Sequence, residues 1–99
     1  MFSPKQLADI DLILDHYGHD HQMVKTVEEL GECIVAITRL IALNHTNNAS
    51  LKEHAIEEVA DALIMLTQAR IILGKDDVDS VIQYKIGRTA DRILSERIK

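Results

Sequence analysis

The sequence has little of what shapes β-rich folds or disulfide scaffolds. Among its 99 residues it has 1 proline, 4 glycines and 1 cysteine, and only 3% of the residues are aromatic. So few glycines and prolines leave little punctuation for the turns of a β-rich fold, and the scarcity of aromatics implies an aliphatic core. A single cysteine excludes an intramolecular disulfide and suits a reducing compartment, so we expect a cytoplasmic protein.

Positive charge and long hydrophobic runs are also scarce. The chain has 11 Lys and Arg against 16 Asp and Glu, a formal net charge of -5. A binder of nucleic-acid backbones needs a basic surface, so we predict no nucleic-acid partner. The longest apolar stretch, residues 62–73, contains polar residues and is too short to span a bilayer. No basic N-terminal region precedes an apolar run, so we predict neither a signal peptide nor a membrane partner.

What remains is the composition of a small helical domain. A chain of this length accommodates one domain with a modest core. We therefore predict a single all-α domain over residues 1–99, an antiparallel bundle of about four helices. Ser3-Pro4 is typical of a helix start, Ser50 begins a capping-box pattern, and Gly74 is typical of a helix end. The predicted helices are residues 4–17, 21–44, 51–73 and 78–97, with a loop at 46–50.

The apolar residues of the second and third predicted helices indicate burial and self-association. In the second helix one stripe at helical spacing is expected to face the core. Its residues are Val27, Leu30, Ile34, Ile37 and Ile41. The third helix is apolar nearly all round after Val59, which is typical of a helix that is covered on several sides. In so short a chain this favours a second subunit as part of the cover.

Residues 16–21 contain three histidines and Asp20, between the first two predicted helices. A transition-metal site is conceivable there. We favour a polar turn, because no spacing in the segment matches a common closed site.

Two acidic turns interrupt the apolar helices and organise the chain. They are Glu28-Glu29-Leu30-Gly31-Glu32 and Glu57-Glu58-Val59-Ala60-Asp61. Acids three residues apart lie on one face of a helix, and carboxylates beside apolar surroundings are costly unless they are paired or bind a metal. A hard divalent cation shared by both turns is the simplest partner, and all-oxygen ligands favour Mg²⁺ or Mn²⁺. A di-iron site is disfavoured because no Glu has a His three residues later.

The chain resembles the MazG-like all-α nucleoside triphosphate pyrophosphohydrolases, in particular their short, phage-type members, over roughly residues 22–93. The resemblance lies in Gln22-Met23-x-Lys25-x-x-Glu28-Glu29-Leu30-Gly31-Glu32, in Glu57-Glu58-Val59-Ala60-Asp61-Ala62-Leu63, and in Tyr84-Lys85-Ile86-Gly87-Arg88-Thr89. The order and separation of the two acidic turns is its most specific part.

The resemblance implies a metal site, a reaction and an oligomer. Its metal ligands would be Glu29, Glu32, Glu58 and Asp61. The implied cofactor is Mg²⁺, and the implied reaction cleaves a nucleoside triphosphate between its α- and β-phosphates, in nucleotide-pool housekeeping. Glu32 or Glu29 would act as general base. The implied assembly is a homodimer or homotetramer.

Basic residues complete the site that the resemblance implies. Lys85 and Arg88, with Lys25, would hold the phosphate oxygens as charge develops. The alternative is a non-catalytic helical oligomer, a binding or regulatory module. In that case the acidic side chains would be solvated, or paired with Lys25, Arg39, Lys85 or Arg88.

Overall fold

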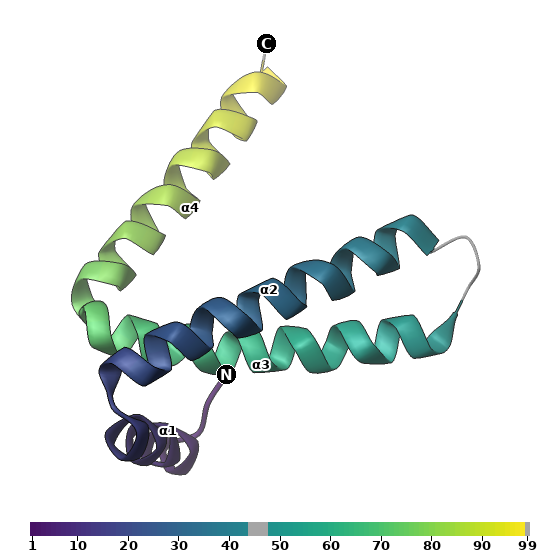
Figure 1. Ribbon diagram of the computed structural model, residues 1–99. Coiled ribbons are helices and arrows are strands. Elements are labelled where there is room, and N and C mark those ends of the chain that lie inside the picture. The colour runs from purple at the N-terminus through teal and green to yellow at the C-terminus, as the bar shows by residue number, and fades with distance from the viewer. Residues whose placement is uncertain (44–47, 99) are drawn as a thin grey trace. The chain divides into compact units, whose positions relative to one another are not determined.

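The computed structural model describes residues 1–43 and 48–98, and within these ranges the chain forms four helices and no strand (Figure 1). The helices are α1 (Pro4–Tyr17), α2 (His19–Leu43), α3 (Ala49–Leu73) and α4 (Lys75–Ile98). The all-α prediction with four helices is confirmed. The chain divides into two compact units, Met1–Ala69 and Arg70–Lys99, which are described separately below.

Helix α1 begins and ends where its sequence predicts. The backbone N–H of Gln6 donates to Ser3 Oγ at 3.1 Å, and the N–H of Ser3 donates to Gln6 Oε1 at 2.9 Å. These reciprocal bonds satisfy two N–H groups that a helix start leaves unpaired, and Pro4 has none to satisfy. The helix ends at Gly18, whose φ of 88° is one that glycine adopts without steric strain.

The starts of the other helices differ from the prediction by two or three residues. Helix α2 begins at His19, two residues early. Its predicted end at residue 44 and the first two residues of the predicted loop, 46 and 47, lie outside the described residues. Ser50 was the wrong cap for α3, because Asn48 Oδ1 accepts the backbone N–H of Ser50 at 3.0 Å and the helix begins at Ala49. Helix α4 begins at Lys75, because Gly74 alone, with a φ of 114°, makes the turn from α3.

In the first unit, α2 and α3 lie side by side and run antiparallel (Figure 1), and α1 packs against α2. The buried residues of the pair are mostly small or polar. They are Gln22, Thr26, Cys33 and Ala36 on α2, and Ala55, Ala62, Met65, Gln68 and Ala69 on α3. Apart from the neighbours Gln68 and Ala69, they are spaced by three, four or seven residues, so each helix turns one continuous face toward its partner. Small side chains on these faces let the two helices approach closely.

The predicted apolar stripe of α2 is therefore wrong as the buried face. Val27, Ile34 and Ile41 are 71%, 66% and 69% exposed within the chain. The buried small and polar residues lie on a different side of the helix. The larger aliphatic side chains are therefore exposed within the chain.

A pair of buried amides joins α2 and α3 at one end of their contact. Gln22 and Gln68 are only 3% and 1% exposed. Gln22 Nε2 donates to Gln68 Oε1 at 2.7 Å, and Gln22 Oε1 lies 2.7 Å from His21 Nδ1. Gln68 Nε2 donates to the backbone oxygen of Ile64 at 3.4 Å. Because both amides are satisfied only when these residues face each other, the pair fixes the register of the two helices.

In the second unit, a paired guanidinium and carboxylate brace the turn at Gly74. Arg70 Nε donates to Asp79 Oδ1 at 2.7 Å and Arg70 Nη2 donates to Asp79 Oδ2 at 2.6 Å. This two-bond geometry lowers the pKa of Asp79 and raises the pKa of Arg70, in each case mainly through the hydrogen bonds themselves. None of residues 75–98 is buried. Among the described helices, none combines the length and the hydropathy needed to cross a membrane.

Candidate metal centre

The packing of α2 against α3 brings two carboxylates into the contact between the helices. Glu29 continues the buried face of α2 between Thr26 and Cys33, and Glu58 continues that of α3 after Ala55. The side chains of both glutamates are only 12% exposed. The same spacing that forms the helix contact therefore places two acids where water has little access.

Glu32 completes a group of three acids at the edge of this contact. It lies one turn after Glu29, on the exposed lip of α2. One carboxylate oxygen from each of Glu29, Glu32 and Glu58 lies within 4.8 Å of the other two. Oxygens bound to one Mg²⁺ are about 3.0 Å apart when adjacent and about 4.2 Å apart when opposite, so side-chain movements of less than about 2 Å would bring the three to ligand distance.

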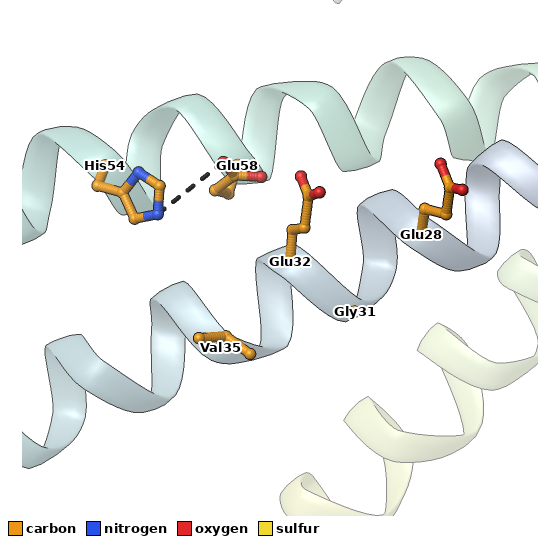
Figure 2. A pocket seen from close by; sticks show the side chains of 6 residues that line it. All are labelled: Glu28, Gly31, Glu32, Val35, His54 and Glu58. Atoms are coloured by element: carbon orange, nitrogen blue, oxygen red, sulfur yellow. Dashed lines mark ion pairs between the residues drawn. The ribbon is translucent and has the colours of Figure 1, made fainter.

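Two of the three acids, Glu32 and Glu58, line an open cleft between α2 and α3. Figure 2 shows the side chains of Glu32 and Glu58 pointing toward each other from the two helices. The cleft has a volume of about 690 Å³. Its lining residues are Glu28, Gly31, Glu32, Val35, His54 and Glu58. Glu32 and Glu58 are thus accessible to a ligand that enters from solvent, whereas Glu29 lies behind them in the helix contact.

A basic residue stands beside each buried carboxylate. Lys25 Nζ lies 3.3 Å from Glu29 Oε1 and 3.4 Å from Glu28 Oε2. These contacts, the one with Glu29 first, raise the pKa of Lys25, and a pairing of this kind is what the non-catalytic alternative expects. On α3, His54 Nε2 lies 3.9 Å from Glu58 Oε1 (Figure 2). In both cases the basic residue precedes the acid by four positions on the same helix, where side chains meet.

The second oxygen of each buried carboxylate has no such neighbour. Glu29 Oε2 and Glu58 Oε2 are buried, and neither has a hydrogen-bond partner among the described residues. A buried carboxylate oxygen without a partner destabilises the folded state by about 1–3 kcal/mol or more. A cation bound beside these two oxygens would supply the partner that each of them lacks.

The other predicted site residues do not join this group. Asp61 is exposed on α3 and lies outside the three-carboxylate group. Lys85 and Arg88 are exposed on α4, in the second unit. The guanidinium carbon of Arg88 lies 5.5 Å from the centre of the Tyr84 ring, one turn away. Their part in the site stays a prediction from the sequence.

The histidine-rich segment forms no metal-binding group with nearby acids or cysteines in the described ranges. Instead, the rings of Tyr17 and His21 stack at 5.1 Å. Sequence reasoning also missed His54. Its only signal was its position four residues before Glu58, a spacing that charged helices often contain.

Comparison with known proteins does not assign the chain to a family. No family model, no curated protein and no solved structure matches it. The case for a function therefore depends on the residues of the cleft and on the sequence resemblance.

Proposed function

We propose that the protein is a Mg²⁺- or Mn²⁺-dependent nucleoside triphosphate pyrophosphohydrolase, which converts a nucleoside triphosphate to the monophosphate and pyrophosphate. The observation that supports this most is the group of Glu29, Glu32 and Glu58, in which two buried oxygens lack a partner. The order of the two acidic turns in the sequence supplies the reaction class.

The residues present fit a hard divalent cation. The three ligands offer carboxylate oxygens only, the donors that Mg²⁺ and Mn²⁺ prefer. Bound there, the cation would neutralise the triphosphate and lower the pKa of an attacking water. Asp61 enters the proposal as a fourth ligand through the resemblance alone.

The carboxylates of the cleft differ in what they can do beyond binding a metal. Glu29 has one oxygen beside Lys25 and a side chain only 12% exposed. Glu32 is exposed on the lip of the cleft and reaches solvent water directly. We therefore assign the role of general base to Glu32. Lys85 and Arg88 remain the proposed phosphate-binding residues.

A non-catalytic helical module is the rival hypothesis. It expects the acids to be solvated or paired with basic residues, and the contact between Lys25 and Glu29 agrees with it. It gives no reason for two neighbouring glutamates to keep buried, unpartnered oxygens on facing helices. That feature favours the metal site.

We also propose that the protein is a homodimer or homotetramer. Large aliphatic side chains remain exposed on both helices of the pair, among them Val27 at 71% on α2 and Ile56 at 58% on α3. Burying such surface against a second copy would stabilise the assembly by about 25 cal/mol per Å² of apolar area. Sedimentation equilibrium should give two or four times the mass of the chain, 11.1 kDa; a monomer at micromolar concentration would contradict the proposal.

The reaction is tested by measuring pyrophosphate release from a panel of ribo- and deoxyribonucleoside triphosphates with Mg²⁺. We compare the wild type with Glu58→Gln and with Glu57→Gln, a neighbouring exposed glutamate that gives the same change in charge. We expect release by the wild type and by Glu57→Gln, and none above background by Glu58→Gln. No release by the folded wild type from any nucleotide, or equal activity in all three proteins, would contradict the proposed function.

A further inference from the structure

The two buried carboxylates at the contact between α2 and α3, Glu29 and Glu58, share one arrangement, although they lie on different helices. In each, Oε1 is the atom nearest a basic side chain four residues earlier, and Oε2 is the buried atom without a partner. Lys25 stands beside Glu29, and His54 stands beside Glu58. In both carboxylates, therefore, one oxygen lies near a basic side chain and the other is available to a metal.

At a metal site, a basic group beside one carboxylate oxygen can hold the other oxygen in the orientation that the metal needs. The terminal torsion of a glutamate is soft, so a free carboxylate rotates and presents either oxygen. A hydrogen-bond donor on one oxygen restricts this rotation and leaves the other oxygen directed at the metal. Residues that orient metal ligands in this way typically contribute about 10- to 100-fold to metal affinity.

We propose that His54 is a positioning residue for Glu58: its Nε2–H group holds Oε1 and so presents Oε2 to the cation. This inference rests on the proposed function, because it requires the cleft to bind a divalent metal. The separation of 3.9 Å is too long for a hydrogen bond. His54 lines the open cleft and its side chain is 47% exposed, so a small rotation toward Glu58 has no packing to displace.

The contact involves one specific nitrogen, which gives a sharp choice of variants. The Nε2 amide of glutamine reaches about as far from the backbone as the imidazole Nε2, whereas the asparagine amide corresponds to Nδ1 and stops short. His54→Gln therefore keeps the donor where Glu58 needs it. His54→Asn keeps the polarity but moves the donor away, and His54→Leu removes it.

The test measures Mn²⁺ affinity of the full chain from the electron paramagnetic resonance signal of free Mn²⁺. Circular dichroism checks that each variant has the helical content of the wild type. We expect His54→Gln to bind Mn²⁺ within about twofold of the wild type, and His54→Asn and His54→Leu to bind about 10- to 100-fold more weakly. Spin-echo modulation from a directly bound nitrogen should be absent in the wild type, because His54 acts through Glu58.

Three results would overturn the inference, and they are distinguishable from one another. Wild-type affinity in all three variants would remove His54 from the site and leave the metal centre intact. Equal weakening in all three, or a directly coordinated nitrogen in the wild type, would make the imidazole itself a ligand. No Mn²⁺ binding by the wild type would overturn the proposed function together with this inference.

Discussion

The contact between α2 and α3 contains two buried polar pairs that differ in one respect. The amides of Gln22 and Gln68 hydrogen-bond to each other at 2.7 Å and satisfy their remaining groups locally. The carboxylates of Glu29 and Glu58 each keep a buried oxygen without a partner. The first pair is complete within the chain, as a structural element should be. The second is incomplete, which is what a binding site for a cation requires.

The largest expected effect is on the incomplete pair, when a metal is added. A cation that binds only the folded protein stabilises it by about 2.7 kcal/mol at a concentration of 100 times Kd. We therefore expect saturating Mg²⁺ or Mn²⁺ to raise the Tm of the wild type in scanning calorimetry. Chelation should reverse the shift, and the control variant Glu57→Gln, at an exposed glutamate, should show the same shift as the wild type. A Tm that is unchanged at millimolar metal would count against a metal site at Glu29 and Glu58.

The complete pair should respond strongly to the loss of either member. Gln68→Leu leaves the buried Gln22 amide without its partner, and we expect a loss of about 1–3 kcal/mol in the free energy of unfolding, measured with urea. The double variant Gln22→Leu/Gln68→Leu removes both members and should recover most of that loss. If Gln68→Leu were as stable as the wild type, the amides would not fix the register of the helices.

The incomplete pair should respond in the opposite direction when no metal is present. Glu58→Gln removes one buried charge and one like-charge contact, so we expect the metal-free variant to be more stable than the wild type by about 1 kcal/mol. The same variant should lose the stabilisation by metal. Urea unfolding in the presence of a chelator measures the first effect. The exposed Glu57→Gln should change stability by less than about 0.5 kcal/mol; a destabilised metal-free Glu58→Gln would mean that Glu58 is a structural residue.

The half-buried ion pair of Arg70 and Asp79 gives the smallest expected effect. Arg70 lowers the pKa of Asp79 below its ordinary value of 3.8. Because the folded-state pKa is the lower one, the stabilisation is present above pH 3.8 and is lost as the pH falls through the folded-state pKa. The difference in Tm between the wild type and Asp79→Asn should therefore be small at pH 7 and vanish in strong acid. A difference that grew on acidification would contradict the assigned role of Arg70.

The sequence predicted the helices, and which acids share one helix face, because both depend on local chemistry. Ser3 and Pro4 specify a helix start in any context, and a spacing of three residues puts Glu29 and Glu32 on one helix face. These are properties of single helices.

What the sequence did not predict depends on how one helix meets another. Hydropathy favoured Val27, Ile34 and Ile41 as the buried stripe of α2. The face that is buried instead carries the small side chains of Thr26, Cys33 and Ala36, which let the two helices approach closely. The hydrogen bond of Gln68 could not be predicted from its own helix, because its partner Gln22 lies 46 residues away in the sequence. A role for His54 could not be predicted either, because it depends on the cleft between the two helices that His54 lines.

The most direct test of the metal site is a crystal structure of the protein grown with Mn²⁺, with anomalous scattering measured to locate the ion. We expect one anomalous peak between the two helices, about 2.2 Å from a carboxylate oxygen of each of Glu29, Glu32 and Glu58. Glu29 Oε2 and Glu58 Oε2 would then be ligand atoms. A cleft without a peak, with these carboxylates paired only to basic side chains, would contradict the account.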